Sequence, residues 1–278
     1  MVIRLGLIGD NIEKSQAPDL HRLAGQSLGQ DVTYDRLVPW QLEQSFDQIF
    51  DSCVATGFRG INVTYPYKEL AVPRVQIDDP QVRAIGAINT VVFDADGPRG
   101  YNTDYSGFIE AYKRAMTDKD TGPVTLIGSG GVGRAIAFGL ATLGTKDLRL
   151  VDLDAAKSTA VAEALRAVNS EMTVSVWTDA AAAAQGAAGL INCTPVGMVG
   201  YEGTPLERAA MTGAKWAFDA VYTPVDTEFL NDATSLGLTI ISGWELFFFQ
   251  GLHAWKIFSG TACDEAALRQ NLMQIGGS

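Results

Sequence analysis

Three glycines, Gly128, Gly130 and Gly133, form a G-x-G-x-x-G pattern between a short apolar segment and an alanine-rich apolar segment. In this pattern the first glycine permits a tight turn, the second lets the backbone approach a pyrophosphate, and the third lets the helix lie close to the strand. Asp152 stands 24 residues after Gly128, at the end of a second apolar strand, where a carboxylate can accept hydrogen bonds from a ribose. Glycines also mark plain turns, but the strand, turn, helix and strand around these three predict dinucleotide binding.

The acidic residues after the second strand indicate which dinucleotide binds. Asp152 and Asp154 flank Leu153, and no arginine stands in this loop. A 2′-phosphate there would meet like charge, which costs about 4 kcal/mol for unit charges ~4 Å apart at an effective dielectric constant of ~20. The sequence therefore predicts NAD in preference to NADP. Asp154 is interpreted as the N-cap of the next helix.

Polar side chains gather at the ends of the strands predicted in the first 104 residues. They are Ser15, Asn62, Thr64, Lys68, Asn89, Thr90, Asn102 and Asp104. Hydride transfer between a nicotinamide and an alcohol needs a proton carrier at the alcohol oxygen. Lys68 follows a strand-to-helix turn that Pro66 stiffens, and partial desolvation there would suit an amine to acid–base work. Asp104 would orient this lysine, although spacing alone does not place the two together and most lysines are surface residues.

Histidine and cysteine usage predicts neither a metal site nor a disulfide framework. His21 and His253 lie in apolar helical segments, and each is interpreted as a packed histidine with its hydrogen bonds satisfied. We expect no metal, since no ligand cluster arises from local spacing. Cys53, Cys193 and Cys263 form no C-x-x-C motif, which favours reduced thiols in a cytoplasmic protein.

Composition limits the partners. The chain has 278 residues, 47% of them apolar and 19% charged, which is typical of a folded protein large enough for two domains. It has no run of 18 apolar residues, and its amino terminus is too short and strand-like for a signal peptide. A net charge of −11 argues against nucleic acid binding. We expect a small-molecule substrate, no nucleic acid and no membrane.

The order of predicted elements indicates an α/β fold with two α/β domains. Strands are predicted at 2–9, 32–39, 58–65, in a hairpin at 87–104 that turns at 96–97, and at 124–127, 173–177, 189–194, 215–221 and 238–242. Helices are predicted at 18–28, 41–56, from 68, at 106–116, after the glycine turn, at 155–168, near 179–187, at 245–260 and at 264–275.

Such alternation favours largely parallel sheets, whose ligands bind beyond the carboxyl ends of the strands. We predict an N-terminal substrate domain over 1–115 and a Rossmann-like dinucleotide-binding domain over 116–242. C-terminal helices over 243–278 would return to the first domain or form a dimer surface. An interdomain cleft would then hold the substrate beside the cofactor.

At these residues the chain resembles the shikimate dehydrogenase family, and in particular its NAD-preferring quinate/shikimate subgroup. The resemblance covers nearly the whole chain in seven ordered motifs. These are N-V-T-x-P-x-K at 62–68, A-x-N-T at 87–90, N-T-D-x-x-G at 102–107, G-x-G-G-x-x-R at 128–134, N-x-T-x-x-G-M at 192–198, D-x-x-Y-x-P-x-x-T at 219–227 and the glutamine at 250.

The resemblance implies a reversible NAD(P)-linked oxidation of the C3 hydroxyl of shikimate to a ketone, with Lys68 and Asp104 as the catalytic pair. It implies hydrogen bonds to the substrate, or a place in the cleft wall, for Ser15, Asn62, Thr64, Asn89, Tyr222 and Gln250. It implies cofactor contacts for Gly128, Gly130, Gly131, Val132, Gly133, Asp152, Asn192, Thr194, Pro195, Val221 and Gly243.

Two departures from the family pattern bear on the substrate. Ala17 stands where the family has the second serine of Ser-x-Ser-Pro, and an alanine side chain donates no hydrogen bond to a carboxylate. One lost bond to a charged group is worth roughly 1.5–3 kcal/mol. The stretch at 243–249 also differs; we interpret its phenylalanines as packed, while Trp244 and Leu246 could reshape the cleft near the nicotinamide.

Three functions therefore remain open at the level of sequence. The first is an NAD-dependent dehydrogenase of shikimate, of quinate or of both, since the small Ala17 could make room for the C1 hydroxyl of quinate. The second is a dehydrogenase of a related cyclohexane carboxylic acid of the aminoshikimate type. The third is a non-catalytic NAD-binding regulator on the same fold, which would not need a proton carrier such as Lys68. Either a monomer or a homodimer is compatible with the sequence.

Overall fold

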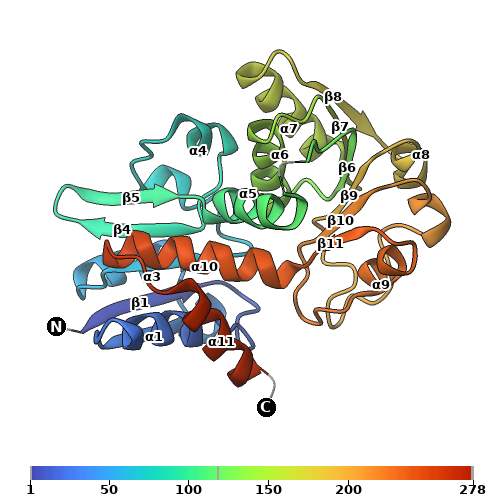
Figure 1. The fold of residues 1–278 in the computed structure, drawn as a ribbon. Helices are drawn as coiled ribbons and strands as arrows, with labels where there is room; N and C mark the ends of the chain where they lie inside the picture. The colour runs from blue at the N-terminus through green and yellow to red at the C-terminus, as the bar shows by residue number, and fades with distance from the viewer. Residues whose placement is uncertain (1, 118, 277–278) are drawn as a thin grey trace. The chain divides into compact units, whose positions relative to one another are not determined.

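The chain divides into two α/β units, which confirms the predicted fold class (Figure 1). The computed structural model describes residues 2–117 and 119–276. Unit 1 comprises Met1–Thr103 and Gln250–Ser278, and unit 2 comprises Asp104–Phe249. The units thus divide inside two helices, whereas the sequence interpretation divides the chain at 115 and 242. Helix α5 (Thr103–Met116) joins unit 2 because Phe108 packs edge-on against Phe218, with ring centroids 5.1 Å apart.

Unit 1 is built on a five-stranded mixed sheet in the order β2-β1-β3-β4-β5. The strands are β1 (Ile3–Ile8), β2 (Val32–Leu37), β3 (Gly60–Val63), β4 (Thr90–Asp94) and β5 (Gly97–Tyr101). The first three are parallel, while β4 and β5 form the predicted hairpin, in which Asp94 pairs with Gly97. The carboxyl ends of β1, β2 and β3 therefore meet at one edge of the sheet.

Alternating residues of β3 separate the two faces of this sheet. Ile61 and Val63 belong to a core with α3, whereas a Cβ on Gly60 would lie 2.6 Å from Phe258 of α10. Asn62 therefore faces the same side as Gly60. The helices of unit 1 are α1 (Ala17–Ser27), α2 (Pro39–Leu42), α3 (Phe46–Ala55), α4 (Pro80–Ile85), the second half of α10 (Gly243–Ser259) and α11 (Glu265–Gly276), with α11 beside α1 (Figure 1).

Two helix predictions in unit 1 are wrong for local backbone reasons. The helix predicted at 41–56 is two helices, because Glu43 adopts a left-handed conformation (φ 52°) and Ser45 starts α3 with a capping box that Gln48 completes. The helix predicted from Lys68 is only a short 3₁₀ turn at Val72–Arg74. Pro73 lies within that turn and has no backbone N–H to continue a helix.

Unit 2 is a doubly wound, fully parallel sheet in the order β11-β10-β9-β6-β7-β8. Its strands are β6 (Val124–Ile127), β7 (Asp147–Val151), β8 (Thr173–Trp177), β9 (Gly189–Asn192), β10 (Trp216–Asp219) and β11 (Thr239–Ile241). Its helices, besides α5 and the start of α10, are α6 (Gly131–Thr142), α7 (Ala155–Val168), α8 (Ala180–Ala184), a 3₁₀ turn (Arg208–Met211) and α9 (Glu228–Ser235). The strand order reverses between β6 and β9, which is where such sheets bind a dinucleotide.

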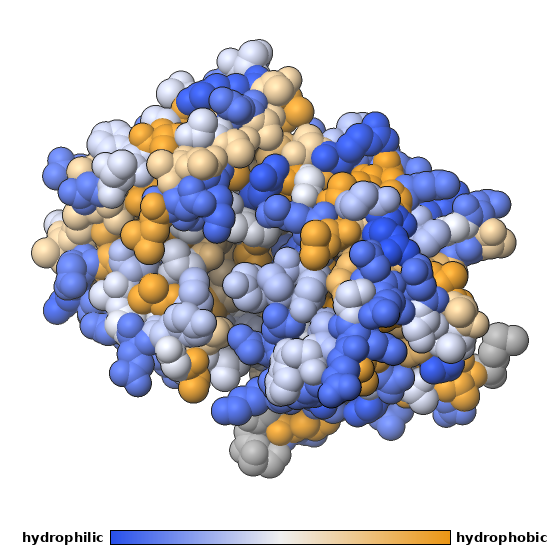
Figure 2. Space-filling model, turned by 180° about the vertical axis from the view of Figure 1, so that it is seen from behind, coloured by the Kyte–Doolittle hydropathy of each residue, from blue (hydrophilic) through white to orange (hydrophobic). Residues whose placement is uncertain are grey.

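Several large hydrophobic side chains are exposed, among them Trp40, Leu153 and Val199. On the face that Figure 2 shows, small groups of hydrophobic residues are interspersed among hydrophilic ones. Within the described residues, no helix combines the length and the apolar character that a membrane span needs.

Candidate functional site

A buried hydrogen-bond network lies at the carboxyl end of β3 in unit 1. The Asn62 side chain is 7% exposed; its Oδ1 accepts from the Tyr34 hydroxyl at 2.9 Å. Its Nδ2 donates to the carbonyl of Asn89 at 3.2 Å and to Thr90 Oγ1 at 3.0 Å. Because both ends of the amide are held, Asn62 has one defined orientation at this edge of the sheet.

The same network reaches Gln250 on α10. Asn89 Oδ1 accepts from the backbone N–H of Thr103 at 2.7 Å and from its hydroxyl at 3.1 Å. The Thr103 hydroxyl also lies 3.4 Å from Gln250 Oε1. The acceptor end of Asn89 is therefore committed to Thr103, and its Nδ2 is the end that can donate to a ligand. Three of the predicted substrate-binding residues, Asn62, Asn89 and Gln250, thus belong to one network.

Sequence reasoning missed two members of this network, Tyr34 and Thr103. Tyr34 lies on β2, 28 residues before its partner Asn62, so no local pattern connects them. Thr103 stands inside the N-T-D motif and could have been singled out there, since its backbone N–H is one of the donors left open at the start of a helix.

Lys68 follows β3 on a turn that is fixed from both sides. The backbone N–H of Thr64 donates to the carbonyl of Ile8, and that of Tyr67 donates to the carbonyl of Thr64, both at 2.9 Å. The Tyr67 hydroxyl donates to Asp10 at 2.6 Å, and burial together with that carboxylate raises the pKa of Tyr67 to about 12. Lys68 is only 9% exposed, so it is not the surface lysine that residue frequency alone would suggest.

Two further predicted residues occupy defined positions within their own units. Asp104 is 6% exposed and stands in the first turn of α5 in unit 2, so its pairing with Lys68 of unit 1 remains a prediction. Ser15, in the loop after β1, accepts a hydrogen bond at Oγ from the N–H of Ala17 at 3.3 Å. Its hydroxyl proton can still be donated.

His21 departs from its prediction in one respect. It is packed as expected, stacked on Tyr34 with ring centroids 5.1 Å apart and edge-on to Phe258 at 5.5 Å. Its Nδ1, however, is buried without a hydrogen-bond partner in the described residues, so the prediction of a fully satisfied histidine is wrong. Burial lowers the pKa of His21 to about 3, although the Asn62 side chain opposes this shift.

In unit 2 the glycine turn has the geometry that the sequence pattern predicts. Gly128 has a φ of 98°, and a Cβ there would lie 2.7 Å from the backbone of Cys193. A Cβ on Gly133 would lie 1.9 Å from the carbonyl oxygen of Gly128. A Cβ on Gly130 would meet nothing within 4 Å, so this position is open for a ligand to approach.

Helix α6 starts at this turn with its first N–H groups uncapped. Gly130 is the N-cap residue and offers no side chain to accept from the helix. The backbone N–H groups of Gly131 and Val132 are therefore available to an anion at the positive end of the helix dipole. The turn, the open Gly130 and these donors fit the pyrophosphate of a dinucleotide.

Asp152 stands at the position expected for ribose binding, and its side chain also holds the glycine turn. Its Oδ2 accepts from the N–H of Ser129 at 2.6 Å and its Oδ1 from the N–H of Asp154 at 2.8 Å. Leu153 between the two acids is fully exposed. Asp154 accepts from the N–H of Ala156 and caps α7, which confirms its predicted role.

The remaining predicted cofactor residues lie at or after the ends of β9 and β10 and at the start of α10. Near them is Asp219, the first residue of the D-x-x-Y-x-P-x-x-T motif, to which the sequence interpretation assigned no role. Asp219 is fully buried, and its Oδ1 accepts from Asn192 Nδ2 at 3.0 Å and from the N–H of Val221 at 2.9 Å. Asn192 Oδ1 in turn accepts from the N–H of Thr194 at 2.9 Å, the residue before Pro195. A Cβ on Gly243 would lie 2.3 Å from the carbonyl oxygen of Val221.

The aromatic stretch at the start of α10 packs as predicted. Phe247, Phe248 and Phe249 are each at most 5% exposed. Tyr222 stacks on Phe247 with ring centroids 5.1 Å apart, and Trp244 stacks on Phe248 at 5.4 Å. The rings of Tyr222 and Trp244 are therefore fixed by buried neighbours.

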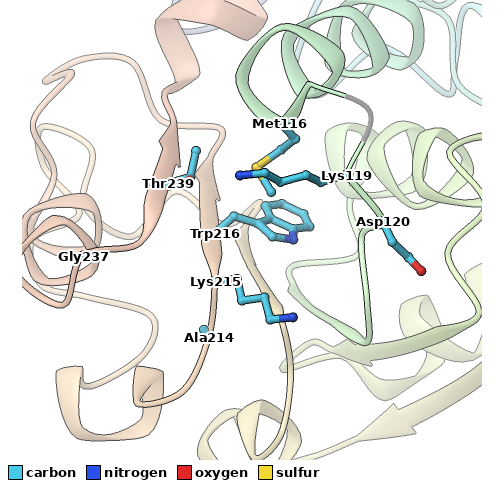
Figure 3. A pocket seen from close by; sticks show the side chains of 8 residues that line it. All are labelled: Met116, Lys119, Asp120, Ala214, Lys215, Trp216, Gly237 and Thr239. Carbon is cyan, nitrogen blue, oxygen red and sulfur yellow. The ribbon is translucent and has the colours of Figure 1, made fainter.

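A hollow of about 590 Å³ in unit 2 is not part of this site (Figure 3). Trp216 and Thr239, which start β10 and β11, line it together with Lys119, Asp120 and Lys215. It thus lies at the amino ends of the strands, whereas ligands of such sheets bind at the carboxyl ends. The described residues contain no group of three or more metal-ligating side chains.

The fold and these two groups of residues define a class of enzyme. A doubly wound parallel sheet carries a glycine turn after its first strand and an acid after its second. A separate mixed sheet carries a network of amides, hydroxyls and a buried lysine. Together they define an NAD(P)-dependent oxidoreductase with a substrate unit of its own.

Comparison with known proteins names the family. Residues 7–91 match the model of the shikimate dehydrogenase substrate binding domain. The chain is 34% identical to the quinate/shikimate dehydrogenase (NAD(+)) of Corynebacterium efficiens, over 98% of both chains. It is 33% identical to the shikimate dehydrogenase (NADP(+)) of Pseudarthrobacter chlorophenolicus, over 98% of this chain and 94% of that one. The chain belongs to the shikimate dehydrogenase family.

A solved structure is similar to this chain over nearly its whole length. The quinate dehydrogenase of Corynebacterium glutamicum in complex with NAD superposes with a TM-score of 0.89 at 31% identity, covering 98% of this chain and 99% of that one.

Proposed function

We propose that this chain catalyses the reversible, NAD-linked oxidation of the C3 hydroxyl of shikimate, quinate or both to the 3-dehydro ketone. Unit 1 would bind the ring acid and unit 2 the dinucleotide. What supports the proposal is a buried Lys68 and the network of Asn62, Asn89 and Gln250 in the same unit, in a chain 34% identical to an NAD-linked quinate/shikimate dehydrogenase.

In this proposal each polar group of unit 1 has a separate task. Lys68, as the free amine, takes the proton of the C3 hydroxyl during oxidation and returns it from the ammonium form during reduction. Asp104 orients that ammonium group. When bound, the nicotinamide supplies the hydride acceptor. The substrate hydroxyls and carboxylate would be held by Ser15, Asn62, Thr64, Asn89 and Gln250, with Tyr222 in the wall of the cleft.

The preference for NAD rests on the charge after β7. Asp152 and Asp154 are both acidic, and the fully exposed Leu153 between them has no charge with which to pair a 2′-phosphate. The cofactor would contact Gly128, Gly130, Gly131, Val132, Gly133, Asp152, Asn192, Thr194, Pro195, Val221 and Gly243. All three cysteines are free thiols, which suits the reducing cytoplasm in which we place the reaction.

A panel of ring acids with each dinucleotide tests the proposal. Shikimate, quinate and an aminoshikimate are each mixed with NAD or NADP, and the absorbance of the reduced nicotinamide is followed. We expect turnover of shikimate or quinate, faster with NAD than with NADP. Turnover of shikimate alone would remove quinate from the proposal, and a preference for the aminoshikimate would favour that runner-up. A chain that binds NAD and turns over none of these acids would be a regulator.

Lys68→Ala tests the proton carrier. We expect kcat to fall about 10²–10⁴-fold, which is the usual contribution of a positioned acid or base, while the affinity for NAD stays unchanged. Lys146→Ala is the matched control, because that lysine is 69% exposed and its ion pair with the exposed Glu171 lies in unit 2. Equal rates in both variants would remove Lys68 from the mechanism.

Ala17→Ser tests how the substrate carboxylate is held. Ala17 is the first residue of α1 and is 8% exposed. A serine there restores one donor toward the carboxylate, so we expect the KM for shikimate to fall about tenfold or more. If Ala17 makes room for the C1 hydroxyl, the KM for quinate should rise in the same variant. An unchanged ratio of the two kcat/KM values would show that this position does not choose the substrate.

A further inference from the structure

Asp219 is a buried carboxylate that ties together three segments of unit 2. It ends β10, and its side chain is fully buried. Its Oδ1 accepts from Asn192 at the end of β9 and from the N–H of Val221 after β10, at 3.0 and 2.9 Å. Its Oδ2 accepts from the hydroxyl of Thr227 at 2.7 Å. Three donors from three segments therefore share one carboxylate.

Each partner passes this restraint to a further group. Asn192 Oδ1 accepts from the N–H and the hydroxyl of Thr194, at 2.9 and 2.7 Å. Thr227 accepts from the N–H of Leu230 and so caps α9. The Val221 carbonyl lies so close to Gly243, at the start of α10, that a Cβ there would approach its oxygen to 2.3 Å. The loops after β9 and β10 are consequently set by one side chain.

The sheet topology assigns these loops to one half of a bound dinucleotide. Strands β6 and β7 carry the glycine turn and Asp152, which serve the pyrophosphate and the ribose of the adenosine half. Strands β9 and β10 lie on the other side of the point where the strand order reverses. A dinucleotide that spans this point places its nicotinamide half over the loops that Asp219 holds.

A purely structural role would not need a charged group here. Burial raises the pKa of Asp219 to about 6, against three hydrogen bonds that lower it. Burying a carboxylate is costly unless hydrogen bonds replace its lost hydration, and Asp219 accepts three of them. The charge strengthens every hydrogen bond that it accepts, and it therefore stiffens the loops at which it is aimed.

We propose that Asp219 is a positioning residue for the nicotinamide half of the cofactor: it fixes the loops after β9 and β10 without touching the ligand itself. The inference rests on the proposed function, because it takes unit 2 to bind a nicotinamide dinucleotide. It adds a residue that orients the reacting end of the cofactor and leaves the adenosine end to Asp152.

Binding of whole and half ligands separates the two ends. NAD and ADP, which carries the adenosine and pyrophosphate alone, are titrated calorimetrically into the wild type, Asp219→Ala, Asp219→Asn and Asp152→Ala. We expect Asp219→Ala to weaken NAD about tenfold or more, the value of one lost bond to a charged group, and to leave ADP unchanged. Asp219→Asn keeps an oxygen that accepts from the N–H of Val221, so its affinity for NAD should fall less than that of Asp219→Ala. Asp152→Ala should weaken both ligands.

Thr227→Val covers the case in which Asp219→Ala does not fold. It removes one donor and leaves the carboxylate in place, so NAD should weaken while ADP does not. Equal loss of NAD and ADP affinity in the Asp219 and Thr227 variants, or no loss of either, would overturn the inference. A wild-type chain that binds neither NAD nor NADP would overturn the proposed function itself, and that result is seen before any variant is made.

Discussion

At the scale of single residues, Asp152 has two tasks in the dinucleotide-binding unit. It accepts from the N–H of Ser129 in the glycine turn and from the N–H of Asp154, and its charge would repel a 2′-phosphate. Asp152→Ala removes both, so we expect the KM for NAD to rise about tenfold to a hundredfold and the gap to NADP to narrow. Steady-state kinetics with each dinucleotide measures this change.

The control for this prediction lies two residues away. Asp154→Ala removes the side chain that caps α7. The backbone N–H of residue 154 remains, so the Asp152 side chain keeps both of its hydrogen bonds. The substitution should lower the melting temperature by a few degrees, as the loss of a cap worth about 1 kcal/mol would. Its effect on cofactor choice should be smaller than that of Asp152→Ala, because the hydrogen bonds of Asp152 remain. A wild-type enzyme that already prefers NADP would show that the charge argument is wrong.

Single residues also show where sequence reasoning reaches its limit. The polar residues of unit 1 were recognisable because the family motifs contain them, and the structure joins Asn62, Asn89 and Gln250 in one network. Tyr34 was not, because its role depends on a partner that only the fold brings to it. Asp219 stands in a motif, but the motif does not show that its carboxylate is buried. Burial is likewise invisible in a sequence, so Lys68 could not be distinguished from a surface lysine without the structure.

At the scale of elements, the turn between β6 and α6 gives a paired prediction. Gly130→Ala places a methyl group in open space, and Gly130 has a φ of −73°, which alanine readily adopts. We expect this variant to keep its stability and to lose dinucleotide affinity, because the methyl group blocks the approach of the pyrophosphate. The binding constant and the melting temperature measure the two effects.

Gly133→Ala should instead lose stability. Its methyl group would lie 1.9 Å from the carbonyl oxygen of Gly128, so the helix must move away from the strand. Overpacking of this kind costs about 1–3 kcal/mol or more. The melting temperature of this variant should therefore fall below that of Gly130→Ala, even without a dinucleotide. Similar stabilities for the two alanine variants would show that the turn is not packed as described.

Elements with strong periodicity were predictable, and those set by one local backbone feature were not. The parallel strands and α10 follow from apolar runs bounded by turn residues. The split between α2 and α3 depends on the left-handed Glu43, a conformation that the residue type does not indicate. The placement of α5 in unit 2 depends on a contact between Phe108 and Phe218, which lie 110 residues apart in the chain.

At the scale of the whole molecule, a fall in pH should destabilise unit 1 and stabilise unit 2, in each case through one buried titratable group. In unit 1, burial holds the pKa of His21 at about 3, below its ordinary value of 6.5. As the pH falls below 6.5, the unfolded chain takes up a proton that the folded unit does not, so unit 1 loses stability. In unit 2, burial raises the pKa of Asp219 from 3.8 to about 6. Between these two values only the folded unit holds the proton, so unit 2 gains stability as the pH falls.

Substitutions that remove each titration expose the two slopes. Since each pH unit within these windows is worth about 1.4 kcal/mol, His21→Phe should gain roughly 3 kcal/mol relative to the wild type in unit 1 between pH 7 and ~4.5, while keeping a ring against Tyr34. Asp219→Asn should lose roughly 2 kcal/mol relative to the wild type in unit 2 over the same range. Hydrogen exchange of the buried strands β1 and β9, measured at both pH values, reports each unit separately. If hydrogen exchange in β1 had the same pH dependence in the wild type and in His21→Phe, His21 would be protonated in the folded protein. Its contacts with Tyr34 and Phe258 would then have to accommodate a cation.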